Sequence, residues 1–247
     1  MPTFKLLRLL LLSFLMATAT ARAEPMDSDA REGFDRQSPA EIEAARAQIE
    51  ALFGGAISPE SLSASEKSAV LNKYRHLDPR REVPSALLDE TVLYFDKNKS
   101  KFPNQDYISV VDYKPHSSIQ RFFVVDIKTG AVEKFRTAHG WASDQDSDGN
   151  AETFGNIVSS GMSSLGFVRT GEVYWGKFKR SVRLDGLSST NSKVRERAVV
   201  VHGWDNVVER NVTQGLSWGC PALDWSVKDG IIDKIKEGSL MNFGYSN

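Results

Sequence analysis

Ser217-Trp218-Gly219-Cys220-Pro221 holds the only cysteine of this 247-residue chain, and His202 lies 18 residues before that cysteine. A thiol becomes a nucleophile when an imidazole takes its proton, and nearby backbone N–H groups then hold the oxyanion that forms on an acyl substrate. We interpret Cys220 as a catalytic nucleophile and His202 as its general base. The N–H groups of Gly219 and Cys220 are the expected oxyanion hole, because glycine lets a substrate approach the backbone closely.

The alternative for Cys220 is a buried structural thiol, and the alternative for His202 is a strand-end histidine bonded to backbone. A lone cysteine in an exported protein has no intramolecular disulfide partner, so a chemical role is favoured. The spacing of the two residues and the neighbouring glycine favour the same conclusion.

The first 23 residues have the features of a secretory signal peptide. Lys5 and Arg8 precede an apolar run from Leu9 to Ala17, and Ala21-Arg22-Ala23 is a small-residue cleavage site. The apolar run is shorter than the roughly 18 residues that a membrane-spanning helix needs. We therefore expect an exported mature protein that begins at Glu24 and has no membrane span.

The charge of the chain gives no electrostatic argument for binding to nucleic acid or to a membrane surface. The chain has 31 Lys and Arg against 32 Asp and Glu, and these residues are scattered along it. Proteins that bind nucleic acid or anionic membranes normally carry a basic excess or cluster. We expect no nucleic-acid partner, and we expect the substrate to be recognised locally.

Residues 24–84 are predicted to form an N-terminal helical segment. Capping boxes at Ser38–Glu41 and Ser63–Glu66 each precede apolar residues at helical spacing, and Gly54-Gly55 ends the first helix near Phe53. A third helix is expected to start at Ser85, where we place the beginning of a catalytic domain that extends to residue 247.

From Tyr107 the chain is predicted to be mainly β. The expected strands and turn are Tyr107–Tyr113, Arg121–Ile127, a Lys128-Thr129-Gly130 hairpin turn, Ala131–Ala138, Gly166–Arg169, Val182–Leu184, Ala198–His202 and Leu240–Phe243. One later helix, Asp224–Glu237, has an N-cap aspartate and a terminating Gly238. The fold class is therefore mainly β with accessory helices.

The motifs resemble those of the L,D-transpeptidases of bacterial cell walls, which have the YkuD-like fold, and especially the variant often called the murein L,D-transpeptidase catalytic domain. Val201-His202-Gly203 and Ser217-Trp218-Gly219-Cys220 correspond to the two family elements. The resemblance covers roughly the last 140 residues and also includes Ala138-His139-Gly140, Ser163-Ser164-Leu165-Gly166-Phe167, Thr170-Gly171-Glu172, Arg183-Leu184-Asp185-Gly186-Leu187 and Gly219-Cys220-Pro221-Ala222-Leu223.

The resemblance implies a β-sandwich preceded by helices, located in the periplasm or at the cell wall and acting on peptidoglycan stem peptides without a cofactor. Cys220 would attack a stem-peptide carbonyl and expel D-Ala, and the acyl group would pass to an amine of a second stem. His202 would serve as base and later as acid, with the oxyanion held at Gly219 and Cys220.

Two departures from the common pattern affect substrate recognition. Trp218 replaces the second histidine of Ser-His-Gly-Cys, and Ala222 stands where Arg or Asn is usual. Arg183 or Arg197 could replace the missing contact, because a guanidinium binds a carboxylate through two hydrogen bonds. The expected substrate-binding residues are Ser217, Trp218, His139 and Arg183, and tryptophans that could stack on glycan are Trp141, Trp175, Trp204 and Trp218.

Two features near His139 have alternative interpretations. His139 fits a cleft-lining loop and a strand-end turn equally well. Asp144-x-Asp146-x-Asp148-Gly149 matches the first half of an EF-hand loop, yet its twelfth position is Gly155 rather than Glu. We interpret the loop as a solvated acidic turn and expect no metal.

The function that these patterns favour is L,D-transpeptidation through a thioester on Cys220. An L,D-carboxypeptidase, in which water replaces the acceptor amine, uses the same residues. A wall-binding module without turnover is the alternative from another class, and the presence of both Cys220 and His202 argues against it. The sequence does not indicate an oligomeric state.

Overall fold

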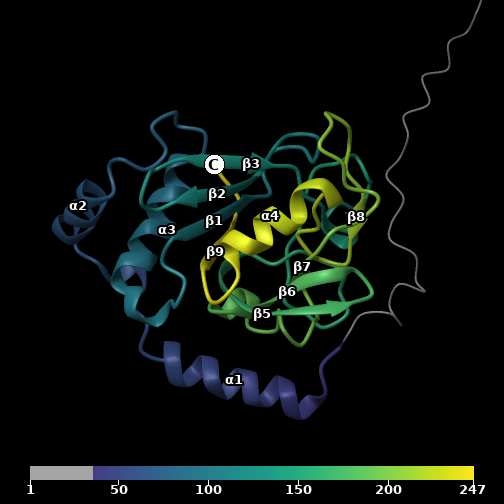
Figure 1. Cartoon of the computed structure of the whole chain (residues 1–247), viewed down its shortest axis with the longest axis horizontal. Coiled ribbons are helices and arrows are strands. Elements are labelled where there is room, and N and C mark those ends of the chain that lie inside the picture. Colours follow the sequence, from purple (N-terminus) through teal and green to yellow (C-terminus); the bar gives the residue numbers. More distant parts are fainter. Residues whose placement is uncertain (1–35) are drawn as a thin grey trace, which may run out of the picture.

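The computed structural model describes residues 36–247, so the predicted signal peptide lies outside the described residues. Helices come first and the strands follow, with one helix among the last strands (Figure 1). The α-helices are α1 Pro39–Phe53, α2 Ala64–Lys73, α3 Ser85–Lys97 and α4 Trp225–Ile235. Single-turn helices are η2 Pro59–Ser61, η3 Lys99–Lys101, η4 Trp141–Ser143 and η5 Ser189–Asn191.

The strands form two sheets of very unequal size. The larger sheet has seven strands in the order β3-β2-β1-β9-β5-β6-β7, and the smaller sheet pairs β4 with β8. Their bounds are β1 Tyr107–Asp112, β2 Phe122–Asp126, β3 Val132–Phe135, β4 His139–Gly140, β5 Gly166–Gly176, β6 Lys179–Gly186, β7 Val200–Val201, β8 Leu216–Ser217 and β9 Leu240–Gly244. The pairs β1–β9 and β4–β8 are parallel and the other pairs are antiparallel. The expected mainly β fold with helices before it is confirmed.

Both faces of the central strands are covered. Along β1, Ile108 and Val110 pack in the cluster that contains the apolar side of α3, whereas Val111 packs in the cluster that contains α4. Successive side chains of a strand point to opposite faces, so α3 and α4 cover opposite faces of the sheet. Burial on both faces explains why β1 and β2 are nearly continuous apolar runs. Cys220 belongs to the cluster on the α4 face.

The two predicted capping boxes are present at α1 and α2. Ser38 accepts from the Glu41 N–H and Ser63 accepts from the Glu66 N–H, and each glutamate bonds back to its serine. α1 buries little of its surface, since Phe53 is its buried residue, and Figure 1 shows it lying beneath β5 and β6. The helices of residues 36–84 are therefore confirmed, while their separation as a segment distinct from the domain stays a prediction.

The β5–β6 hairpin is longer than the sequence indicated. It extends past an irregularity between Thr170 and Val173 to a two-residue turn at Lys177-Phe178. The turn lacks the glycine or asparagine that usually marks a tight hairpin, so no local signal extended the prediction. The predicted strand Ala198–His202 is in fact only Val200–Val201, because Ala198 has a φ of 53° that ends the extended conformation.

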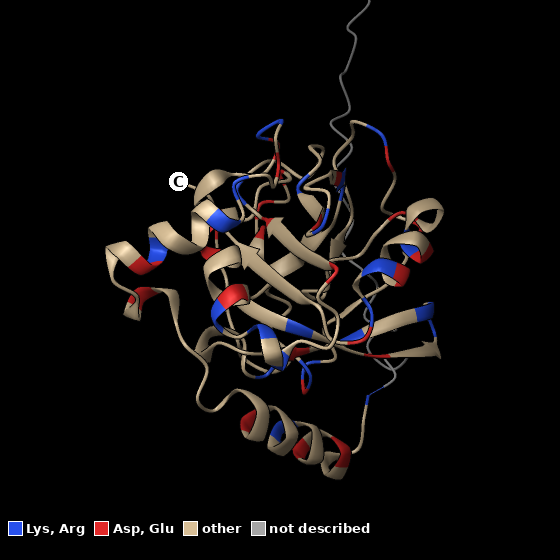
Figure 2. Cartoon of the chain, turned by 60° about the vertical axis from the view of Figure 1, so that its left-hand side comes forward, with Lys and Arg blue, Asp and Glu red and all other residues tan. Residues whose placement is uncertain are grey.

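Acidic and basic residues alternate along the helices and hairpins (Figure 2), in agreement with the absence of a basic cluster in the sequence. Within residues 36–247, no helix combines the length and the apolar character that crossing a membrane requires.

Candidate active site

The turn that carries Cys220 follows β8 and depends on glycine. Gly219 has a φ of +106°, a conformation that L side chains rarely adopt. A Cβ at this position would lie 2.4 Å from the Met162 carbonyl oxygen. Any other residue at position 219 would therefore strain the backbone and displace the neighbouring chain.

His202 follows β7 and lies in a segment that pairs with the Cys220 segment. Gly203 and Leu223 form a parallel bridge, and the Leu223 N–H donates to the His202 carbonyl at 2.9 Å. Residues 202–204 therefore run beside Leu223, three residues after Cys220. This pairing brings together the two motifs that are 18 residues apart in the sequence.

The imidazole of His202 is held in one orientation and is fully buried. Its Nδ1 lies 2.9 Å from the Gly203 carbonyl oxygen, so Nδ1 is the donor and Nε2 has the free lone pair. Nε2 has no hydrogen-bond partner among the described residues, and the centre of the ring lies 4.1 Å from that of the Phe178 ring. Burial lowers the pKa of His202 to about 4. His202 is thus a neutral imidazole with an available proton acceptor.

Cys220 is also buried, with 1% of its surface exposed. Its Sγ contacts the Ala198 carbonyl oxygen at 3.8 Å. Burial raises the pKa of the thiol to about 11, although the Val200 backbone amide and the charge of Arg197 act in the opposite direction. Within residues 36–247, no hydrogen bond joins Sγ to the His202 ring. The resting residues are therefore a neutral thiol and a neutral imidazole.

Ser217 organises the turn and changes the expected oxyanion hole. The Gly219 N–H donates to the Ser217 Oγ at 3.1 Å, so it is already bonded. The same hydroxyl lies 2.7 Å from the Cys220 carbonyl oxygen and 3.1 Å from that of His139. In the resting structure the Gly219 N–H is therefore not free for a substrate, and its expected role in an oxyanion hole stays a prediction. The Cys220 N–H makes no hydrogen bond to any residue in the described range.

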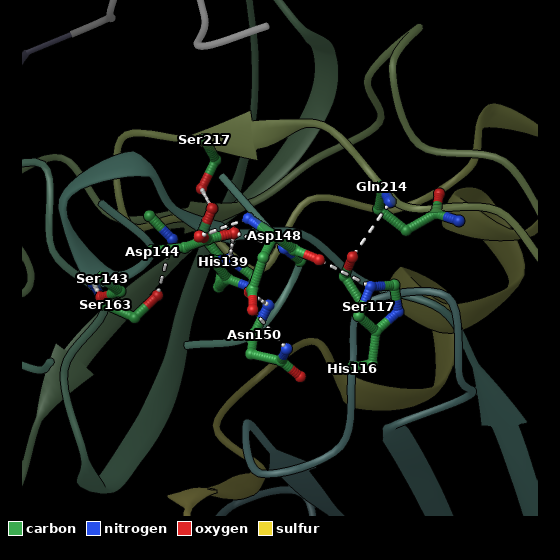
Figure 3. Close-up of polar contacts among 12 residues, drawn as sticks. His116, Ser117, His139, Ser143, Asp144, Asp148, Asn150, Ser163, Gln214 and Ser217 are labelled. Atoms are coloured by element: carbon green, nitrogen blue, oxygen red, sulfur yellow. Dashed lines mark hydrogen bonds and ion pairs between the residues drawn. The ribbon is translucent and has the colours of Figure 1, made fainter. Parts of the chain in front are cut away.

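His139 is a buried link rather than an exposed cleft residue. Arg121 Nη2 donates to His139 Nδ1 at 2.6 Å, and His139 Nε2 lies 3.1 Å from an Asp144 carboxylate oxygen. Because arginine is only a donor, His139 carries its proton on Nε2. Burial lowers the pKa of His139 to about 4. Figure 3 shows His139 with its contacts to Asp144 and Ser217, which connect this link to the cysteine turn.

The sequence suggested that the acidic loop Asp144–Gly149 is a solvated turn, but in the structure part of this loop is buried. Asp144 is buried and accepts from the N–H groups of Asp148 and Gly149 as well as from His139. Asp144, Asp146 and Glu152 have carboxylate oxygens within 4.8 Å of one another. Among residues 36–247, this is the group of side chains whose spacing would allow contact with a metal ion. The Asp144 carboxylate already accepts hydrogen bonds from three donors, and these bonds hold the loop together.

Arg183 does not reach the cysteine. Its neighbours on β6, Val182 and Leu184, point into the cluster that contains Cys220, so Arg183 points to the opposite face. There its Nε pairs with Glu172 at 3.2 Å and its guanidinium lies 4.0 Å from the centre of the Tyr174 ring. The structure therefore does not bring together Arg183 and Cys220 as a substrate clamp requires.

The tryptophans have different environments. Trp218 lies edge to face with Trp141 at 5.6 Å, beside the cysteine turn, and Trp141 is partly exposed. Trp175 on β5 is 76% exposed, whereas Trp204 is buried in a small cluster with Ala222. Trp141 and Trp175 are exposed enough to contact a sugar, whereas Trp204 is a core residue.

Sequence reasoning missed the contributions of Arg121 and Phe178. Arg121 was expected only as the first residue of a strand, yet its fully buried guanidinium binds Pro115, Thr137 and His139. Phe178 was hidden in a hairpin without a turn signal. Neither residue has a local pattern that indicates its distant partner.

Comparison with known proteins identifies the family of the chain. Residues 80–245 match the L,D-transpeptidase catalytic domain family. The chain belongs to this family. The L,D-transpeptidase family is an enzyme family, and the match includes every site residue discussed above. No curated protein matches the sequence.

Two solved structures are similar to this L,D-transpeptidase family member. An L,D-transpeptidase from Mycobacterium smegmatis is 14% identical, with a TM-score of 0.36, and the match covers 56% of this chain and 58% of that chain. An L,D-transpeptidase (residues 123–326) from Xylanimonas cellulosilytica is 11% identical, with a TM-score of 0.34 and coverage of 89% and 100%. The chain thus spans less than two thirds of the Mycobacterium smegmatis chain.

Proposed function

We propose that this protein is a cysteine acyltransferase that cross-links peptidoglycan stem peptides through a thioester on Cys220. The observation that carries the proposal is the arrangement of His202. Its Nδ1 is fixed by the Gly203 carbonyl, its Nε2 has no partner among residues 36–247, and its segment is paired with Leu223, three residues after Cys220. A base with one nitrogen anchored and the other free is suited to move a proton to and from a nearby thiol.

The proton transfer accompanies substrate attack instead of preceding it. With a pKa of about 4 for His202 and about 11 for Cys220, a preformed thiolate and imidazolium pair is a minor state. As the Cys220 sulfur bonds to the stem carbonyl carbon, its proton passes to His202 Nε2. His202 then gives that proton to the departing amine of D-Ala, and the thioester remains on Cys220.

The Cys220 N–H is the backbone donor that supports the oxyanion. It makes no hydrogen bond within the described residues, unlike the Gly219 N–H, which is bonded to Ser217. A single donor of this kind is typically worth about 3 kcal/mol of transition-state stabilisation. Gly219 serves the site through its positive φ, which sets the direction of the next N–H group.

The second candidate activity is L,D-carboxypeptidation. The burial of both Cys220 and His202 favours it, since water reaches a confined thioester more easily than the amine of a second stem peptide does. The same residues act until the acyl enzyme forms, and only the acceptor differs. Activity on stem peptides is consistent with a location in the periplasm or at the cell wall and with residues 1–23 as a signal peptide.

Incubation of the protein with purified muropeptide tetrapeptides, followed by mass spectrometry, separates these activities. Transpeptidation gives cross-linked dimers and free D-Ala. Carboxypeptidation gives tripeptides and free D-Ala without dimers. Unchanged tetrapeptide, with the protein folded, contradicts both and favours a wall-binding module.

A further inference from the structure

Arg197 is a half-buried cation, and the described residues supply no acidic partner for it. Its guanidinium donates to the Gly155 carbonyl at 2.8 Å, to the Ser164 Oγ at 2.5 Å and to the Met162 carbonyl. Within residues 36–247 no carboxylate forms an ion pair with it, and none is among the groups that shift its pKa. These three neutral acceptors hold the guanidinium in place and leave its charge uncompensated.

The charge lies beside the turn that presents Cys220. A Cβ at Gly219 would be 3.1 Å from Arg197 Nη2, so the guanidinium packs against the backbone that precedes the cysteine. The next residue after Arg197 is Ala198, and its carbonyl oxygen is the contact of the Cys220 sulfur. Arg197 and Ala198 therefore both contact the segment of Gly219 and Cys220.

Burying a charge without a counter-charge is costly, so a position that keeps one is a candidate for binding an anion. Arginine has five N–H donors, and the three acceptors above leave two of them available. The anion that the proposed reaction creates at this place is the sulfur of Cys220 as its proton leaves.

We propose that Arg197 is a positioning residue whose charge stabilises the anionic sulfur of Cys220. The S–H bond of Cys220 breaks, its proton bonds to His202 Nε2, and the negative charge left on the sulfur faces the guanidinium. The inference rests on the proposed function for the identity of the proton acceptor. The effect on the thiol itself is measurable without any turnover.

Two other ionisable groups influence this site. Tyr113 is fully buried near both Cys220 and Arg197, and burial raises the pKa of its phenol, so it is neutral. Lys228 on α4 acts on His202, where its charge slightly opposes protonation. Burial lowers the pKa of Arg197, while Cys220 and Tyr113 act to raise it. Arg197 is therefore the cation that acts most directly on the thiol.

The test is the pH profile of Cys220 alkylation by iodoacetamide in Arg197→Gln and Arg197→Lys variants, with adducts counted by intact-protein mass spectrometry. Loss of a nearby charge typically moves a pKa by about one unit or more. We expect Arg197→Gln to move the midpoint upward by about one pH unit, which makes alkylation about tenfold slower at a fixed pH below the midpoint. Arg197→Lys should restore most of the rate.

Matched controls separate charge from packing. Ser164→Ala removes one hydrogen bond of the guanidinium and leaves its charge, and Tyr113→Phe removes the neighbouring phenol. Both should keep the wild-type midpoint. Thiolate ultraviolet absorbance, taken as the difference from Cys220→Ala, gives the same midpoint where reagent access limits alkylation.

An unchanged midpoint in Arg197→Gln overturns the proposal, even if that variant has a raised KM, which would assign Arg197 to substrate binding. Equal shifts in the Gln and Lys variants also overturn it, because the effect would then come from lost packing. An upward shift of the alkylation midpoint in Arg197→Gln but not in Arg197→Lys supports the proposal. If the shift appears while wild-type protein converts no muropeptide, the proposed function fails and the role of Arg197 stands.

Discussion

At the scale of single residues, the side chains of His202 and Cys220 are both uncharged before substrate binds. His202→Gln should lower muropeptide turnover by about 10²- to 10⁴-fold, the usual effect of removing a general base. The same variant should leave the midpoint of Cys220 alkylation nearly unchanged, because burial, and not His202, sets the pKa of the thiol. Comparison of both measurements on one preparation checks this. A midpoint shift of a unit or more in His202→Gln would indicate a preformed ion pair.

Ser217, together with Gly219, determines the shape of the cysteine turn. Ser217→Ala leaves the buried Gly219 N–H without its acceptor, which typically costs about 1–3 kcal/mol. We expect lower stability in urea unfolding together with slower turnover, and Ser217→Thr, which keeps the hydroxyl, should preserve both. Wild-type stability and rate in Ser217→Ala would contradict this account of the turn.

The sequence predicts Cys220 and His202 as the reacting pair because their chemistry and spacing are local patterns, and their roles stay a prediction. It could not predict that the Gly219 N–H is bonded at rest, since whether that group is free depends on the rotamer of Ser217. The orientation of Arg183, which points away from Cys220, could not be predicted for a different reason. The strand alternation that points it away from Cys220 requires the register of β6, which short apolar runs do not define.

At the scale of secondary-structure elements, the β5–β6 hairpin places its turn residue Phe178 on the ring of His202. Phe178→Ala should admit water to His202 and raise its pKa from about 4 toward the ordinary value, because burial is what lowers it. NMR titration of the His202 ring measures the change, and Phe178→Leu, which keeps much of the apolar cover, is the matched control. An unshifted titration in Phe178→Ala would mean that other elements keep the ring dry.

The elements themselves were predictable to different extents. Capped helices and apolar strands such as α1 and β1 are encoded by neighbouring residues, and they appear where expected. The strands β4 and β8 have only two residues each, so no pattern of neighbouring residues predicts them. They exist because His139 pairs with Leu216 and Gly140 with Ser217 across a long separation, and that pairing is a property of the whole fold.

At the scale of the whole molecule, two buried histidines make stability depend on pH. His139 and His202 have pKa values of about 4 in the folded protein, below the ordinary value of 6.5. Between these limits the unfolded chain binds more protons, so stability rises with pH through this window and is lost as the pH falls from about 6.5 to 4. Each histidine contributes up to about 3 kcal/mol to this change.

Urea unfolding at neutral pH and at several values down to about pH 4 measures that dependence. His139→Gln should give a shallower decline, because one of the two buried histidines is removed. An equal slope in wild type and His139→Gln would show that other groups govern acid unfolding.

The central claim for the whole molecule is that Cys220 carries the acyl group of a stem peptide. The most direct measurement is intact-protein mass spectrometry after brief exposure to a muropeptide tetrapeptide, on wild type and on Cys220→Ala with both proteins shown to be folded. We predict an adduct on wild type with the mass of the stem less D-Ala, released by hydroxylamine as a thioester should be, and no adduct on Cys220→Ala. Turnover or an identical adduct in Cys220→Ala would contradict the thioester mechanism.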